Sequence, residues 1–186
     1  MNVYDFDGTI YNGESNRDLI FFTFKSHPFL VLSSLIKALV LYIKYKFKKV
    51  PFERVKETML SFIFKIDNYD KLIDSFVEKN IKKIKSFYLD NKKDNDVLLS
   101  ASYDLWINKF AKKLGIKNVI STNVNSNGKI IGKNCKGKEK VKRFKEFSNK
   151  SINCAYGDRD SDKYILNEAK EAYMVRGNKL IKFKGM

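Results

Sequence analysis

The sequence predicts an α/β protein in which a parallel-sheet core is interrupted by a helical insertion. A short apolar strand opens the chain and runs into Asp5-Phe6-Asp7-Gly8-Thr9. From Asp96 onward, strand and helix patterns alternate, as a parallel sheet with covering helices requires. The residues between these two regions have helical patterns. We therefore expect a core formed by residues 1–13 and 92–186, and an all-helical cap formed by residues 14–91.

The first strand ends in two carboxylates, Asp5 and Asp7. Alternate residues of a strand point to opposite faces, but a strand end that turns into a glycine loop brings both to one site. Paired carboxylates there can bind a hard cation, attack an electrophile and transfer a proton. Because Asp5 is only the fifth residue, we expect no signal or transit segment ahead of this strand.

The insertion contains three helix patterns. Pro28 starts one helix, and Pro51 starts another at a first-turn position. Apolar residues at helical spacing mark the third pattern, and these residues are Val77, Ile81, Ile84 and Tyr88.

The first half of the insertion is unusually apolar, from Leu19 to Ile43. Its main apolar run is about 15 residues long, is interrupted by Lys37, and is shorter than the roughly 20 residues that span a bilayer. The favoured interpretation is a helix buried within the cap. The alternative is an interfacial helix lying on anionic lipid, helped by the basic flank of Lys44, Lys46, Lys48 and Lys49.

Three later segments carry candidate site residues. A strand that begins at Asp96 ends at Ser100, and a helix closed by Gly115 follows it. A lysine cluster lies at the start of a further helix, where Lys140 is favoured and Lys138 is second, because Phe144 and Phe147 sit four and seven residues beyond Lys140. Lys136 also competes for this role.

The last of these segments is a strand that ends in Gly157-Asp158, with Asp162 one turn into the next helix. Asp160 lies between Asp158 and Asp162 and is expected to take no part in the site. Earlier, Asn127-Gly128 between apolar residues predicts a β-hairpin.

These four segments, in this order, resemble the four motifs of the haloacid dehalogenase (HAD) superfamily of aspartate-nucleophile phosphatases. The helical insertion resembles the C1-type cap of the phosphoserine phosphatase-like branch, subfamily IB. The resemblance implies a Rossmann-like core and a Mg²⁺-dependent phosphomonoester hydrolase that works through an aspartyl-phosphate.

In that scheme Asp5 is the nucleophile and Asp7 the general acid and base. The Mg²⁺ ligands are Asp5, the Asp7 carbonyl and Asp158, and Asp162 orients them. The resemblance also places Ser100 and one lysine, Lys140 or Lys138, on the phosphoryl oxygens. Gly8, Thr9 and Ala101 are expected beside the phosphate.

The substrate is less defined. Glu14 stands where phosphoserine phosphatases place the glutamate that binds the substrate's amino group, and Arg17 and Arg54 offer partners for a carboxylate. An equal alternative is that Glu14 only stabilises the first cap helix. The residues Gly8, Ala101 and Ser102 depart from the pattern of serine-specific enzymes.

The apolar insertion and the phrase Cys-x-Gly-x-Glu-Lys-Val at 135–141 resemble phosphatidylglycerophosphatase C-type enzymes. We therefore expect a small metabolite phosphate or a lipid-linked phosphate as substrate. The alternatives are phosphoserine specifically, or transfer of the phosphoryl group through the same intermediate.

The net charge of +16 raises a non-enzymatic alternative, a membrane-surface or nucleic-acid binding protein with an idle core. However, 32 of the 37 basic residues are lysine, a profile that an AT-rich genome produces without selection for binding. No nucleic-acid module accompanies the charge, so we expect no nucleic-acid partner. Two cysteines make no disulfide framework; we expect Cys154 to be a buried thiol and the protein to be cytoplasmic, alternatively membrane-associated.

Overall fold

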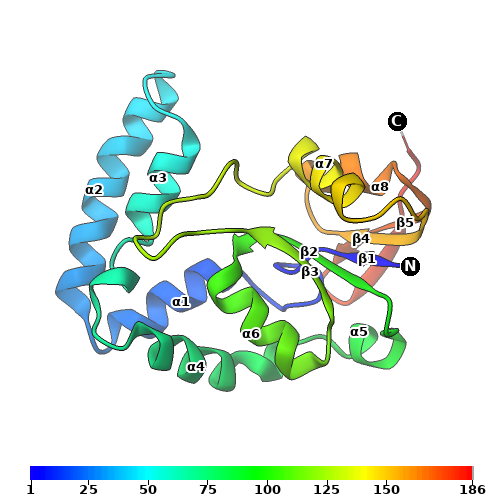
Figure 1. Cartoon of the computed structure of the whole chain (residues 1–186), viewed down its shortest axis with the longest axis horizontal. Helices are drawn as coiled ribbons and strands as arrows, with labels where there is room; N and C mark the ends of the chain where they lie inside the picture. Colours follow the sequence, from blue (N-terminus) through cyan, green and yellow to red (C-terminus); the bar gives the residue numbers. More distant parts are fainter. Residues whose placement is uncertain (186) are drawn as a thin grey trace.

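The computed structural model describes residues 1–185, which form a mixed α/β fold around one sheet (Figure 1). Within this part of the chain, six strands follow the order β3-β2-β1-β4-β5-β6, and every pairing except β5 with β6 is parallel. The predicted α/β class is confirmed. The strands are β1 Val3–Tyr4, β2 Val97–Tyr103, β3 Asn118–Thr122, β4 Ile152–Gly157, β5 Ala169–Arg176 and β6 Lys179–Lys182.

The short strand β1 lies at the centre of the sheet. Val3 pairs with Val97 on one side and with Ala155 on the other. Its side chain is buried in the hydrophobic cluster on one face of the sheet, and Tyr4 belongs to the cluster on the opposite face, as strand alternation requires. Because β1, β2 and β4 are parallel neighbours, their carboxyl ends share one edge of the sheet.

Helices cover both faces. The helix α6 (Asp104–Leu114) packs with the insertion on one face, and α7 (Lys138–Phe147) and α8 (Lys163–Leu166) cover the other (Figure 1). As predicted, Gly115 ends α6 in a left-handed conformation, with φ of 71°.

All the regular elements between β1 and β2 are α-helices or 3₁₀ turns. Its helix α4 packs against α6, where the ring centroids of Phe76 and Phe110 lie 6.0 Å apart. The helices α2 and α3 form a pair that projects from one end of the molecule (Figure 1). The bounds are α1 Ser15–Phe24, α2 Pro28–Lys46, α3 Phe52–Met59, α4 Tyr69–Asn80 and α5 Ser86–Asn91, with 3₁₀ turns at Ile63–Lys65, Ile81–Lys83 and, after β4, Asp160–Asp162.

The third helix pattern is not one helix. Its α-helix ends at Asn80, and a 3₁₀ turn separates it from α5. The interruption lets Ile84 form an antiparallel bridge with Tyr11, in the loop that follows β1. Tertiary pairing with this loop therefore overrides the helical periodicity.

The favoured interpretation of the apolar helix, burial within the cap, is wrong. The helix α2 has 19 residues, and within it only Val31, Ser34 and Ala38 are buried. By length and composition α2 could cross a membrane, which the shorter run in the sequence did not predict. The sequence pattern identified the apolar residues of α2 but could not reveal that those on its outer face lack a packing partner.

The loop between β3 and α7 reaches across to α3. Its turn at Asn127-Gly128 forms a single bridge between Val124 and Ile130, less than the predicted hairpin. Gly128 has φ of +73°, and a Cβ there would lie 2.3 Å from the Phe64 ring of the insertion. This loop therefore packs closely against the cap.

The two cysteines are free, but their environments differ from the prediction. Cys135 is fully buried, whereas Cys154 on β4 is only half-buried. On β4, Cys154 and Tyr156 lie on the same face of the strand, and both are only partly buried.

Candidate active site

The site is built on Asp5, at the carboxyl end of β1. The Asp5 amide donates to the carbonyl of Tyr156, which extends the pairing of β1 with β4 by one residue. The carboxylate is almost fully buried and accepts a hydrogen bond from Lys140 Nζ, 2.5 Å from Asp5 Oδ1. Burial raises the pKa of Asp5, and the Lys140 charge opposes that rise.

Lys140 is the buried cation of the site. Its ammonium also donates to Asp162 Oδ1 at 2.7 Å, so it bridges two carboxylates. These two carboxylates raise the pKa of Lys140 despite its burial. Lys140 lies near the start of α7, which follows Gly137 with φ of +61°.

The other two lysines of this cluster are placed differently. Lys138 is exposed, and its ammonium lies 5.7 Å from the centroid of the Tyr164 ring, outside the cavity that Asp5 lines. Residues two apart on a helix point about 200° away from each other, so Lys138 and Lys140 cannot both face the sheet edge. Lys136 lines the same cavity as Asp5.

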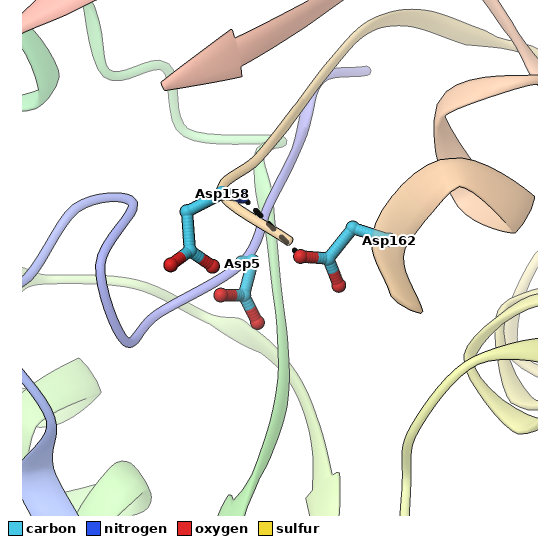
Figure 2. Close-up of side chains that lie close together, drawn as sticks. All are labelled: Asp5, Asp158 and Asp162. Atoms are coloured by element: carbon cyan, nitrogen blue, oxygen red, sulfur yellow. Dashed lines mark hydrogen bonds between the residues drawn. The ribbon is translucent and has the colours of Figure 1, made fainter. Parts of the chain in front are cut away.

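Three carboxylates converge at this edge (Figure 2). Oxygens of Asp5, Asp158 and Asp162 lie within 4.8 Å of one another. Asp162 Oδ2 accepts the amides of Asp158 at 3.3 Å and Arg159 at 3.2 Å, which fixes the turn between β4 and α8. Burial, together with the Asp162 charge, raises the pKa of Asp158 to about 6.

This cluster fits a divalent cation. Clustered carboxylate oxygens are the ligands that Mg²⁺ uses, and Asp158 Oδ1 is buried without a hydrogen-bond partner among residues 1–185. Gly8 makes room for Asp158: it has φ of +75°, and a Cβ there would lie 2.1 Å from Asp158 Oδ2. Of the described side chains, Asp5 and Asp158 are best placed to hold the ion, with Asp162 beside them.

Asp7 is held at both of its oxygens. The Ser15 amide donates to Oδ1 at 2.5 Å, and the Ser102 hydroxyl donates to Oδ2 at 2.5 Å. Ser102 in turn accepts from the side chain of Asn16 at 2.9 Å. Ser102, which departs from the pattern of serine-specific enzymes, therefore orients Asp7, a role that sequence reasoning missed.

The remaining phosphate-binding candidates lie deeper. Thr9 is fully buried, and its hydroxyl lies 3.4 Å from Asp5 Oδ2. Ser100 is also buried, and its Oγ accepts the Ser102 amide at 3.0 Å. Of the residues predicted beside the phosphate, Ala101 lines the cavity, whereas Gly8, Thr9 and Ser100 do not.

The helix α3 of the insertion forms one wall of the cavity. Phe52, Lys56 and Met59 line its wall, and they share one helix face because they lie four and three residues apart. Lys56 is buried and donates to the Ala101 carbonyl at 2.5 Å and to Asn134 Oδ1 at 2.8 Å. Burial lowers the pKa of Lys56 to about 7. A lysine between two apolar residues of one helix face was the signal that could have identified it.

Glu14 is paired within the protein. Its carboxylate forms an ion pair with Arg159, which joins the start of the cap to the turn after β4. Neither arginine predicted for a substrate carboxylate lines the cavity, and Arg54 instead lies 3.9 Å from Glu57. Lys56 takes the place of Arg17 and Arg54 as the cap's cation at the site.

Comparisons with known proteins identify the family and the fold of the chain. The family model of haloacid dehalogenase-like hydrolases matches residues 3–167. No curated protein sequence matches the chain.

Several solved structures share the fold. A protein of unknown function from Bordetella pertussis Tohama I is 15% identical, with a TM-score of 0.74 over 94% of this chain and 88% of that one. A phosphoserine phosphohydrolase-like protein from Francisella tularensis subsp. tularensis SCHU S4 is 19% identical, with a TM-score of 0.57 over 94% and 87%. A substrate-bound phosphoserine phosphatase is 19% identical, with a TM-score of 0.56 over 91% and 82%.

Proposed function

The chain belongs to the haloacid dehalogenase-like hydrolase family, and on that premise we propose that it is a Mg²⁺-dependent phosphatase of phosphate monoesters. One observation carries the proposal. The Asp5 carboxylate lies at a cavity, braced by the buried Lys140 ammonium and surrounded by Asp7, Asp158 and Asp162.

Asp5 acts as the nucleophile. Its second carboxylate oxygen, Oδ2, attacks phosphorus, the bond from phosphorus to the leaving oxygen breaks, and an aspartyl-phosphate forms. Asp7 gives its proton to the leaving oxygen. Asp7 then takes a proton from a water whose oxygen attacks phosphorus, and the bond between the Asp5 oxygen and phosphorus breaks, which releases inorganic phosphate and restores the Asp5 carboxylate.

The neighbouring groups support this exchange. Lys140 holds Asp5 in position through Oδ1, and the attacking oxygen is Oδ2, which has only the long contact of 3.4 Å from the Thr9 hydroxyl. When bound at Asp5 and Asp158, Mg²⁺ would neutralise negative charge on the phosphoryl group. Ser102 and the Ser15 amide fix the direction in which Asp7 offers its proton.

The cavity limits the substrate. Its volume of about 160 Å³ is below the roughly 300–1,000 Å³ of sites that enclose drug-sized ligands. A phosphate and a small polar group therefore fit inside, and any acyl chains of a lipid substrate would have to remain outside. We propose a small metabolite phosphate or the phosphorylated head group of a lipid.

The ion pair of Glu14 with Arg159 argues against phosphoserine as the specific substrate, because the Glu14 charge is already compensated. Lys56 and Lys136 instead offer cations to an anionic or polar leaving group. Transfer of the phosphoryl group to an acceptor other than water remains an alternative that uses the same intermediate.

Release of inorganic phosphate from p-nitrophenyl phosphate tests the proposal. We expect turnover that a chelator abolishes and Mg²⁺ restores, and that Asp5→Asn abolishes because the amide is not a nucleophile. Asp160→Asn is the matched control, since Asp160 is exposed in the same acidic segment. Turnover by Asp5→Asn at the wild-type rate would refute the mechanism, and an inactive wild type across a panel of esters would favour an idle core.

A further inference from the structure

The helix α2 presents an apolar face to solvent. At 100° per residue, the exposed aliphatic and phenylalanine side chains fall within an arc about 100° wide, opposite the buried stripe of Val31, Ser34 and Ala38. The partly exposed Tyr42 and Tyr45 lie outside this arc. A surface helix of a globular protein normally carries polar residues on its outer face. The outer face here contains Phe29, Leu32, Ile36, Leu39, Val40, Ile43 and Phe47, and each of these is 49–85% exposed.

This face needs a partner. An exposed apolar patch that is continuous along a helix of 19 residues marks an interaction site. The helix also meets the length and composition criteria for a membrane-crossing segment.

The charges around the face indicate which partner. Residues 19–52 contain six lysines and no Asp or Glu. Lys37 and Lys44 lie seven residues apart on one flank of the apolar face, and Lys48 lies just beyond the end of the helix. Lysines in these positions can extend their charged ends to lipid head groups while their stems lie along apolar surface.

We propose that the outer face of α2 docks on the surface of an anionic lipid bilayer. Aliphatic side chains would enter the acyl boundary, and the flanking lysines would contact anionic head groups. A second copy fits less well, because a two-fold contact through this face would bring two sets of six lysines together. Nucleic acid offers no counterpart for an aliphatic face.

Docking on the surface fits the fold better than crossing the bilayer. The inner face of α2 is already packed, chiefly against α3. Both α1 and α3, which precede and follow α2, belong to the same folded body, so the two ends of α2 lie on one side of any membrane. The helix α3 also lines the cavity through Phe52, Lys56 and Met59, which places the site beside the docking surface.

Co-sedimentation of the full chain with vesicles tests this proposal independently of enzymatic activity. We expect binding to vesicles of phosphatidylcholine mixed with phosphatidylglycerol, weaker binding to phosphatidylcholine alone, and loss of binding as salt rises. Each lysine near an anionic surface contributes about 1 kcal/mol, which corresponds to about fivefold in partitioning. Lys37→Glu with Lys44→Glu should therefore weaken binding by at least about 25-fold.

Matched variants separate specific docking from general charge. Leu39→Ser with Ile43→Ser should abolish binding and leave the melting temperature unchanged, because both side chains are exposed. The apolar control is Leu180→Ser with Ile181→Ser on the edge strand β6, and the charge control is Lys112→Glu with Lys150→Glu. Both controls should bind like the wild type. If the Leu39 and Ile43 pair destabilises the protein, Phe29→Ser replaces it.

Several outcomes would overturn the proposal. Wild-type protein that stays in the supernatant with anionic vesicles at low salt would do so, as would full binding by the apolar-face variant. A lipid-free dimer that this variant dissociates would identify a second copy as the partner. Bound protein that resists both high-salt and alkaline washing would show that α2 inserts across the bilayer.

Discussion

Replacing Lys140 by methionine tests the buried charge arrangement of the site. Methionine keeps a long side chain but removes the ammonium, whose Nζ lies 2.5 Å from Asp5 Oδ1 and 2.7 Å from Asp162 Oδ1. The side chains of Lys140, Asp5 and Asp162 are only 2%, 9% and 3% exposed. Removing one partner of a buried pair costs about 3–5 kcal/mol, because the remaining charge is left without compensation.

We expect the lower end of that range for Lys140→Met, about 3 kcal/mol in the free energy of unfolding. Burial already raises the pKa of Asp5, so this carboxyl can take up a proton and limit the cost. At this chain length the loss corresponds to about 6–12 °C in melting temperature. A carboxyl group whose pKa is raised by folding, such as Asp5, destabilises the folded protein at pH values above the pKa of the unfolded state. The stability deficit of Lys140→Met should therefore shrink as pH falls toward about 4.

Urea unfolding in the presence of a chelator measures this effect without a bound metal. Lys138→Met is the matched control, because Lys138 is exposed two residues away, and it should change stability by no more than about 0.5 kcal/mol. A loss below about 1 kcal/mol for Lys140→Met, which is typical of exposed ion pairs, would refute the buried bridge.

Three further predictions address other parts of the molecule. Ser102→Ala should lower kcat about ten- to hundredfold with little change in KM, since a hydrogen bond to a charged group contributes about 1.5–3 kcal/mol. Steady-state kinetics measure both constants, and a change confined to KM would contradict the orienting role of Ser102. Burial lowers the pKa of Lys56 to about 7, below its unfolded value, so the unfolded state binds more protons than the folded state between about pH 7 and 10. As pH rises through that window, the wild type should therefore gain stability relative to Lys56→Met. Denaturant unfolding at both pH limits tests this, and a stability difference that stays constant would disprove it. Burial raises the pKa of the Cys135 thiol to about 11. An alkylating reagent at mildly alkaline pH should therefore modify Cys154 alone until the protein unfolds, as measured by mass spectrometry. Rapid modification of Cys135 in the folded protein would be inconsistent with its burial.

The fold was largely predictable because its signals are local. Predicted strand ends at Asp5 and Asp158 mark the edge where parallel strands bring side chains together. The strand predicted to end at Ser100 instead continues to Tyr103. Gly115 ended its helix as expected. The favoured choice of Lys140 rested on helical spacing to Phe144, and the structure places that lysine on Asp5.

Other features depend on contacts between distant segments, which no local pattern encodes. The ion pair of Glu14 with Arg159 joins residues 145 positions apart. Lys56 reaches the site only because α3 folds over Ala101. Likewise, an apolar helix reads the same in the sequence whether its outer face is covered or open, as it is in α2.

The central position of β1 has a consequence for synthesis. Val3 is made long before its two neighbours in the sheet, Val97 and Ala155. At about 5–20 residues per second, translation from β1 to β4 takes roughly 8–30 s. During that interval the first strand has no sheet partners on one side, and the acidic cluster of Asp5, Asp158 and Asp162 cannot assemble. The nascent chain therefore gains its site only after nearly all of the family-matched region has left the ribosome.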